Sequence, residues 1–360
     1  MVLLKSFELK LIILSISASL LFANEITSNI PVTNYFEEVE EVNISISENS
    51  LITGMSFSKD KIFVCIDYNY VVVFNAEGDI EKKFGRDEFK PFTANNAISY
   101  SNQGFIYLSH IINGRSYLSK YSLDGILISD KKFHPIYING IKINSSNNIL
   151  IGGLNIRKYK SMLEKYDRNS LFFAKKYKKI WRNYFKEATG QWITELNSSF
   201  EQVDSIFRVQ DDIRPRLNAA YLNIFSFDID TSQNIWAYAF PDSGLRIFNA
   251  SGDGFRYMPL KENDYKIPEI YVPEERWKII ENNNALYFDY ELLIIEPYIF
   301  ISYETNNKDK NNSSRKMSVY TTDGEFLERF DFPYRPFKHE NALYFWVEEK
   351  GKLQLIRCSN

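Results

Sequence analysis

The side chains that most often carry out chemistry in proteins are few in this sequence. Its three histidines are His110, His134 and His339, and none of them is paired at the HxH or HxxxH spacing with which one element binds a metal ion. The GxSxG, HExxH, P-loop and GxGxxG motifs are also absent. We therefore expect no metal site and no cofactor, and the sequence assigns no catalytic residue.

One short run has the alternating oxygen-bearing side chains of a calcium loop. Asp228, Asp230, Ser232 and Asn234 occupy alternate positions, as the ligands of such a loop do. However, the sixth position is not glycine, and Ala239 stands where the closing glutamate is required. The run also aligns with polar turns elsewhere in the chain, so we interpret it as a hairpin turn.

A group of aromatic residues is the best candidate for a binding surface. Its members are Trp181, Tyr184, Phe185, Trp192, Phe200 and Phe207. The segment that contains them, residues 178–222, does not follow the period of a strand and is compatible with a helix or a packed loop. Aromatic side chains on an inserted segment can anchor a protein partner or stack on a sugar. The alternative is that they cap the fold and bury one another.

The chain also contains a strongly basic stretch. Residues 157–186 hold eleven Lys or Arg against two acidic residues, which would suit an anionic component of a cell envelope. Two purely structural roles are equally compatible with it. The stretch can be an edge strand whose lysines prevent sheet-to-sheet pairing, or its charge can be neutralised by the acidic residues of 187–212.

A repeated pair of hairpins must position these candidates. Five segments combine an apolar-aromatic strand, a polar turn and a second alternating strand. They align on Phe74, Tyr121, Tyr166, Phe248 and Tyr320, followed four residues later by Gly78, Gly125, Ser170, Gly252 and Gly324. Glycine at the turn permits the positive φ that a tight hairpin needs. A second hairpin precedes most copies, as in residues 55–66 and 97–109, so each unit has about four strands.

The spacing of the units predicts an all-β propeller. The first two intervals between aligned aromatics are 47 and 45 residues, which suits one four-stranded blade each. The next two are 82 and 72 residues, which indicates insertions near 178–222 and 261–286. We expect six four-stranded blades, with five or seven as near alternatives, and a helical or irregular insertion at 178–222.

The two ends of the chain are expected to meet. Residues 340–358 begin a sixth unit that ends before its outer strand, and residues 40–46 can supply that strand and so protect the open edge. Cys65 and Cys358 would then lie in neighbouring blades. An exported chain can join two such cysteines in a disulfide; otherwise they are two buried thiols.

Residues 55–85, MSFSKDKIFVCIDYNYVVVFNAEGDIEKKFG, resemble a blade of the NHL-type and related six-bladed propellers. The shared features are the strand, the polar turn, the IFV-like strand and the closing Phe-Gly. The resemblance extends more loosely from about residue 50 to the C-terminus. It implies a fold, because such propellers include scaffolds, ligand binders, lactonase-like hydrolases and lyases.

The N-terminus indicates export. Residues 1–23 combine Lys5 and Lys10 with an apolar stretch that is shorter than the roughly 20 residues of a membrane-spanning helix. We interpret residues 1–23 as a signal peptide, with an uncleaved anchor as the alternative. Residues 24–39 are an acidic linker, and 40–360 form the propeller. We expect a periplasmic or extracellular protein with no transmembrane segment after cleavage.

The composition narrows the function only slightly. The formal net charge is −3, and it becomes −4 without residues 1–23, so the basic face typical of nucleic-acid binding is not expected. We predict a non-catalytic propeller that acts as a protein-binding or scaffold module in the cell envelope. The alternatives are a lactonase- or lyase-type enzyme with a metal ion in the central channel, or a protein that binds a carbohydrate or another small ligand.

Overall fold

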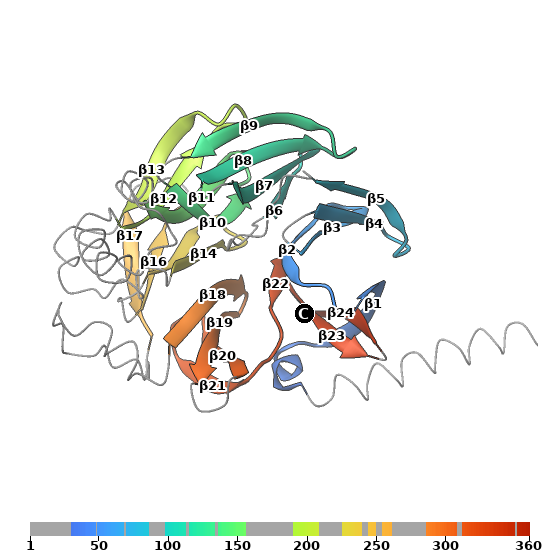
Figure 1. Cartoon of the computed structure of the whole chain (residues 1–360). Coiled ribbons are helices and arrows are strands. Elements are labelled where there is room, and N and C mark those ends of the chain that lie inside the picture. Colours follow the sequence, from blue (N-terminus) through green and yellow to red (C-terminus); the bar gives the residue numbers. More distant parts are fainter. Residues whose placement is uncertain are drawn as a thin grey trace, which may run out of the picture.

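A computed structural model of the chain shows a ring of six antiparallel sheets (Figure 1). It describes residues 30–47, 49–67, 70–85, 98–112, 115–133, 136–155, 190–208, 225–239, 244–249, 254–260, 286–307, 312–349 and 351–360. Each sheet has four strands, which we call a to d from the axis outward. The ring is a six-bladed β-propeller, which confirms the predicted fold class.

The first three blades follow one another along the chain. Blade 1 consists of β2 (Ile52–Phe57), β3 (Lys61–Ile66), β4 (Tyr70–Asn75) and β5 (Ile80–Gly85). Blade 2 consists of β6 (Ile98–Ser101), β7 (Phe105–Ile112), β8 (Arg115–Ser122) and β9 (Leu127–Phe133). Blade 3 consists of β10 (Ile136–Ile143), β11 (Ile149–Asn155), β12 (Gly190–Leu196) and β13 (Gln202–Arg208).

The last three blades complete the ring. Blade 4 consists of β14 (Phe225–Ile229), β15 (Ile235–Ala239), β16 (Gly244–Phe248) and β17 (Phe255–Pro259). Blade 5 consists of β18 (Leu286–Ile295), β19 (Tyr298–Asn307), β20 (Asn312–Thr321) and β21 (Phe326–Asp331). Blade 6 consists of β22 (Phe337–His339), β23 (Ala342–Glu349), β24 (Lys352–Ser359) and the N-terminal strand β1 (Glu38–Ser47).

Strand β1 closes the ring as predicted. It pairs with β24 in antiparallel register from Glu38 opposite Ser359 to Ser47 opposite Lys352. A short 3-10 helix, η1 (Pro31–Tyr35), precedes it, and its fully buried Val32 belongs to the core between blades 5 and 6. Strands c and d of blade 6 therefore come from the two ends of the described chain and are paired by hydrogen bonds, with no turn between them.

Blade 3 corrects one detail of the sequence prediction. Its strands c and d are β12 and β13, whereas the repeat pattern placed them at residues 162–177, which lie outside the described residues. The expectation of a helical or irregular insertion over 178–222 was therefore wrong for residues 190–208, which contain β12 and β13. The physical reason lies in the turn: Phe200 has φ of 63° at the position where Gly78 and Gly125 stand in blades 1 and 2. Without glycine, the turn does not match the rule by which the repeats were aligned.

The core consists of separate clusters in the seams between neighbouring blades. Alternate residues of a strand face opposite seams, so the position of each cysteine in its strand decides which seam its side chain enters. Cys65 lies in the cluster between blades 1 and 2, whereas Cys358 lies in the cluster between blades 5 and 6. Both thiols are free and buried. The structure therefore agrees with the alternative of two buried thiols and not with the possible disulfide, because each side chain points away from the seam that blades 1 and 6 share.

Strand direction gives the disc two different faces. Because neighbouring strands are antiparallel, all a–b and c–d turns lie on one face, which we call the turn face. All b–c and d–a connections lie on the other, which we call the connection face. The turn-face connections have two to six residues, whereas those of the connection face have two to 34. The basic stretch 157–186 falls within the b–c connection of blade 3 and lies outside the described residues.

Candidate functional site

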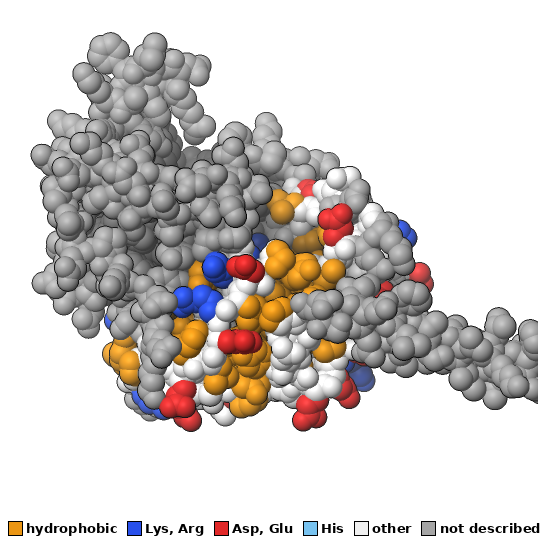
Figure 2. All heavy atoms as spheres, turned by 90° about the horizontal axis from the view of Figure 1, so that it is seen from below, with side chains coloured by type: hydrophobic (Ala, Val, Ile, Leu, Met, Phe, Trp, Pro, Cys, Tyr) orange, Lys and Arg blue, Asp and Glu red, His pale blue; other side chains and the backbone are white. Residues whose placement is uncertain are grey.

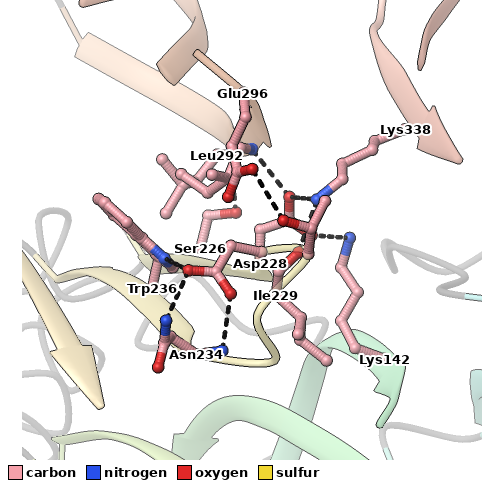
Figure 3. Close-up of polar contacts among 12 residues, drawn as sticks. Lys142, Ser226, Asp228, Ile229, Asn234, Trp236, Leu292, Glu296 and Lys338 are labelled. Atoms are coloured by element: carbon pink, nitrogen blue, oxygen red, sulfur yellow. Dashed lines mark hydrogen bonds and ion pairs between the residues drawn. The ribbon is translucent and has the colours of Figure 1, made fainter. Parts of the chain in front are cut away.

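The most polar part of the described axis is centred on Asp228, near the turn-face end of β14. The Asp228 side chain is only 2% exposed. Its carboxylate receives the ammonium groups of Lys142 from blade 3, at 2.7 Å, and Lys338 from blade 6, at 2.8 Å. The backbone N–H of Ile294 in blade 5 donates to the same carboxylate at 2.8 Å. One side chain therefore connects four blades (Figure 3).

The ionisation of this cluster follows from its surroundings. Burial alone would raise the pKa of Asp228, but Lys142, Lys338 and the Ile294 N–H together hold that pKa below its usual range. Burial lowers the pKa of Lys338, while Asp228 opposes this effect. The Lys338 ammonium also donates to the Ile229 carbonyl oxygen at 2.6 Å. The cluster thus holds charged groups whose partners are all within the protein.

Asp230 faces away from this cluster and belongs to its own hairpin. Its carboxylate accepts hydrogen bonds from the backbone N–H of Asn234 at 2.7 Å, from the Asn234 amide at 2.9 Å and from the Trp236 indole at 2.8 Å. Figure 3 shows Asn234 and Trp236 on the opposite side from Lys142 and Lys338. The run from Asp228 to Asn234 is therefore the polar turn that the repeat indicated.

Contacts of side chains join neighbouring blades at the turn-face ends of their inner strands and in the a–b turns that follow them. The joined pairs, in blade order, are Ser56 with the Tyr100 N–H, Ser101 with Asn147, the Ser145 N–H with Gln233, Thr231 with Glu296, and Asn341 with the Glu296 carbonyl. Between blades 6 and 1, His339 stacks on Phe57 with ring centroids 4.7 Å apart. The turn face is thus fastened at all six seams.

The other described carboxylates of the inner strands also have protein partners. Glu291 of β18 pairs with Arg335 at 2.6 Å, and Glu296 accepts a hydrogen bond from Thr231 at 2.8 Å. Within the described ranges, no three His, Cys, Asp or Glu side chains gather in a way that could hold a metal ion. The described axis therefore offers structural ion pairs, whose charged groups are bound by one another and by backbone groups.

The structure does not bring the predicted aromatic residues together as one described surface. Trp181, Tyr184 and Phe185 lie outside the described residues, and only the backbones of Trp192 and Phe207 are described, in β12 and β13. Phe200 is 3% exposed and packs edge-on against Tyr107, with centroids 6.0 Å apart. It is a core residue and does not present its ring to a partner.

The described histidines have structural surroundings. His110 of β7 is buried and stacks on Tyr117, with centroids 5.6 Å apart. The pKa of His339 is lowered by burial, against the opposing effect of Glu340. Sequence reasoning missed Lys142 and Lys338 because each is a lone lysine on an inner strand. The only signal was a charged residue in the otherwise apolar, alternating pattern of each strand.

The rim of the disc carries exposed apolar side chains on its outer strands. Those most exposed are Ile80, Ile126, Leu127, Ile128, Val203, Phe255, Tyr257 and Leu327. Figure 2 shows the molecule from below the view of Figure 1, where hydrophobic side chains form patches interspersed with both basic and acidic side chains. Single exposed apolar residues are common on proteins, but their recurrence on the outer strands of blades 1 to 5 gives this rim a surface that a protein can contact.

Comparisons with known proteins agree with the fold. No protein-family model matches the chain, and no curated protein matches its sequence. The chain is similar to a solved structure from Bacteroides fragilis, described as an exported protein, at 11% identity and a TM-score of 0.50, covering 90% of this chain and 95% of that one. It is also similar to a PQQ-bound aldose sugar dehydrogenase from Streptomyces coelicolor, at 9% identity and a TM-score of 0.50, covering 89% and 98%.

These likenesses show a fold that exported proteins and enzymes share, and they do not choose between these functions. The part of the chain that the structure describes has no helix with the length and apolar character needed to cross a membrane.

Proposed function

We propose that this chain is an exported, non-catalytic propeller that acts as a protein-binding scaffold, with its connection face as the binding surface. We retain the NHL-type relationship, suggested by residues 55–85, as part of this proposal. The observation that carries it is the axial cluster. The Asp228 carboxylate, which is only 2% exposed, is bound by the ammonium groups of both Lys142 and Lys338.

This cluster argues against metal-dependent chemistry at the same carboxylate. A divalent cation beside Asp228 would lie within a few ångströms of two ammonium groups, and like charges at that separation repel strongly in a buried site. The same ion pairs tie four blades together. They therefore support a rigid ring that holds a binding surface in a fixed shape.

The choice of the connection face rests on strand register. Asn155, the last residue of β11, pairs directly with Gly190, the first residue of β12. The blade is thus complete without the 34 residues between them, so these residues are not needed to form the sheet. Long connections on a rigid framework are where proteins most often place binding residues.

The test compares two variants with the full chain in photo-crosslinking from the native cell envelope. In the first variant, an Asn-Gly turn replaces residues 156–189, because the Asn155–Gly190 pair accepts a two-residue hairpin. A deletion of 180–220 would be unsuitable, since it would remove both β12 and β13. The second variant, Leu127→Ser, alters the competing rim surface, where Leu127 is 37% exposed.

We expect one specific protein partner to crosslink with the full chain and with Leu127→Ser, and to be lost from the shortened variant. All three proteins should keep the same melting temperature. If the partner is lost from Leu127→Ser alone, the binding surface is the rim. If all three fold and none captures a protein, the scaffold function is wrong, and one tightly bound metal ion per purified chain would then favour the enzyme.

A further inference from the structure

The outer hairpin of blade 4 differs from those of the other blades in its register. Strands β16 and β17 pair without a register shift, from Gly244 opposite Pro259 to Phe248 opposite Phe255. The c–d pair of each other blade contains at least one shift, and such an irregularity bends a strand and disturbs its pairing. The alternation of β17 is continuous, so Phe255 and Tyr257 lie on the same face of the sheet.

Blade 4 also has unusual residue types at one cross-strand pair. Arg246 of β16 lies opposite Tyr257 of β17. In blades 1, 2, 3 and 5 the equivalent pair joins a small or β-branched residue of strand c to a polar or charged residue of strand d. These pairs are Val72 with Lys83, Ser119 with Asp130, Thr194 with Ser205, and Ser318 with Arg329. The fold therefore does not require an aromatic ring and a guanidinium group at this position.

Both rings are exposed at the rim, and one of them has a fixed position. Strand β17 lies at the outer edge of blade 4 (Figure 1), where Phe255 is 55% and Tyr257 is 43% exposed. The Phe255 ring packs against the buried Phe248 ring, with centroids 5.6 Å apart. The Arg246 guanidinium group lies 5.6 Å from the centre of the Phe255 ring. Since alternate residues of a strand are about 7 Å apart, the two rings form a short row.

The charge beside this row is positive. Strands β16 and β17 contain Arg246 and Arg256 and no acidic residue, although the whole chain has a net charge of −3. Alternation places Arg256 on the opposite face of β17. Arg246 is therefore the one charged side chain that these two strands place beside the rings. The row complements a ligand that has flat apolar faces and a negative charge.

We infer that Arg246, Phe255 and Tyr257 form a binding site for an acidic glycan. Linked sugar rings stack on the two aromatic rings, and a sugar carboxylate pairs with the guanidinium group. A sugar ring presents C–H groups on its flat faces, which pack on an aromatic ring, while its hydroxyl groups lie at the edge. The planar guanidinium group of arginine matches the geometry of a carboxylate.

Two features favour a glycan over a protein partner. The aromatic anchors of protein interfaces cluster in well-packed pockets, surrounded by contacts that exclude water, whereas these rings lie in a row on an edge strand. A row of two also matches a ligand whose own rings repeat. Phe255 begins β17 at its turn-face end, so the site is distinct from the connection face proposed above for protein binding.

The test measures the binding of galacturonate, digalacturonate and neutral cellobiose to the full chain by isothermal titration calorimetry. Three variants, Tyr257→Ser, Phe255→Ile and Arg246→Thr, each introduce the residue type that another blade has at the same position, so each should keep the fold. Leu327→Ser is the matched control, because Leu327 is 42% exposed on the outer strand of blade 5. Melting temperatures of all the variants verify folding.

We expect digalacturonate to bind the full chain and Leu327→Ser about tenfold more tightly than galacturonate does, since two rings are then covered. Tyr257→Ser and Phe255→Ile should each weaken digalacturonate binding by about tenfold, and Arg246→Thr should remove the preference for digalacturonate over cellobiose. The inference is wrong if the full chain binds neither uronate, or if the three folded variants bind digalacturonate as tightly as the full chain. Loss of a crosslinked protein from Tyr257→Ser without uronate binding would assign the rings to a protein partner instead.

Discussion

Replacing Lys338 with methionine tests whether the axial cluster holds the ring together. Lys338→Met keeps the length of the side chain but removes one of the two ammonium groups that neutralise Asp228. Asp228 keeps Lys142 at 2.7 Å in this variant, so the loss is that of one hydrogen bond between charged groups, about 1.5–3 kcal/mol. A fold of this length has an unfolding entropy of about 0.7 kcal/mol per kelvin, so calorimetry at pH 7 should show a melting temperature lower by about 2–4 °C.

The pH dependence gives the sign of the effect. The folded-state pKa of Asp228 lies below its ordinary value, so its contribution to stability is complete above the unfolded-state pKa and is lost as the pH falls through the folded-state pKa. In Lys338→Met that pKa rises, since a positive charge is gone. The stability difference between the two proteins should therefore narrow as the pH falls below about 4, where Asp228 becomes protonated.

Two further variants make this test decisive. Asp228→Asn removes the carboxylate from both Lys142 and Lys338, so it should destabilise the fold more than Lys338→Met, which leaves Asp228 paired with Lys142. Lys316→Met breaks an exposed pair with Asp331, at 3.7 Å, and should shift the melting temperature by less than about 1 °C. A Lys338→Met protein that melts within about 1 °C of the unmodified chain at pH 7 would refute the structural role of the cluster.

Two other predictions concern ring closure and the thiols. In urea unfolding, Gly78→Ala should destabilise the fold by about 1–3 kcal/mol more than Gly104→Ala. Both glycines have positive φ, but only a Cβ at Gly78 would overlap the Asn43 carbonyl of β1. Equal losses of stability would show that β1 does not hold this turn. Cys65 and Cys358 should both react with a thiol reagent only after unfolding, since burial raises the pKa of each thiol, and a reducing agent should leave the melting temperature unchanged.

The sequence predicted most of the architecture because the repeat signals are local. Glycine four residues after an aligned aromatic marks the c–d turn, and the structure gives Gly78, Gly125 and Gly324 the positive φ that this pattern requires. The same rule failed in blade 3, where Leu196 is the aligned residue and Phe200 follows it. A bulky residue in the left-handed region is uncommon, so the glycine rule could not locate that turn, although Asn197 and the two serines after it are typical turn residues.

The candidate site was not predictable for a different reason. Lys142, Asp228 and Lys338 lie in three blades, far apart in the chain, and no spacing rule links them. Whether the two cysteines form a disulfide could not be decided from the sequence for the same reason. The repeat pattern placed Cys65 and Cys358 in neighbouring blades, but the seam that each side chain faces depends on the phase of its strand.

The contrast between the two faces follows from what each connection must do. On the turn face, several a–b turns bond a neighbouring blade, so an insertion there would separate hydrogen-bonded partners such as Thr231 and Glu296, which are 2.8 Å apart. On the connection face, the pairing of Asn155 with Gly190 closes the sheet before the chain continues. Loop-closure entropy grows only slowly with length, so a long b–c connection costs the fold little. A new binding segment can therefore be added at the connection face while the turn face keeps the ring rigid.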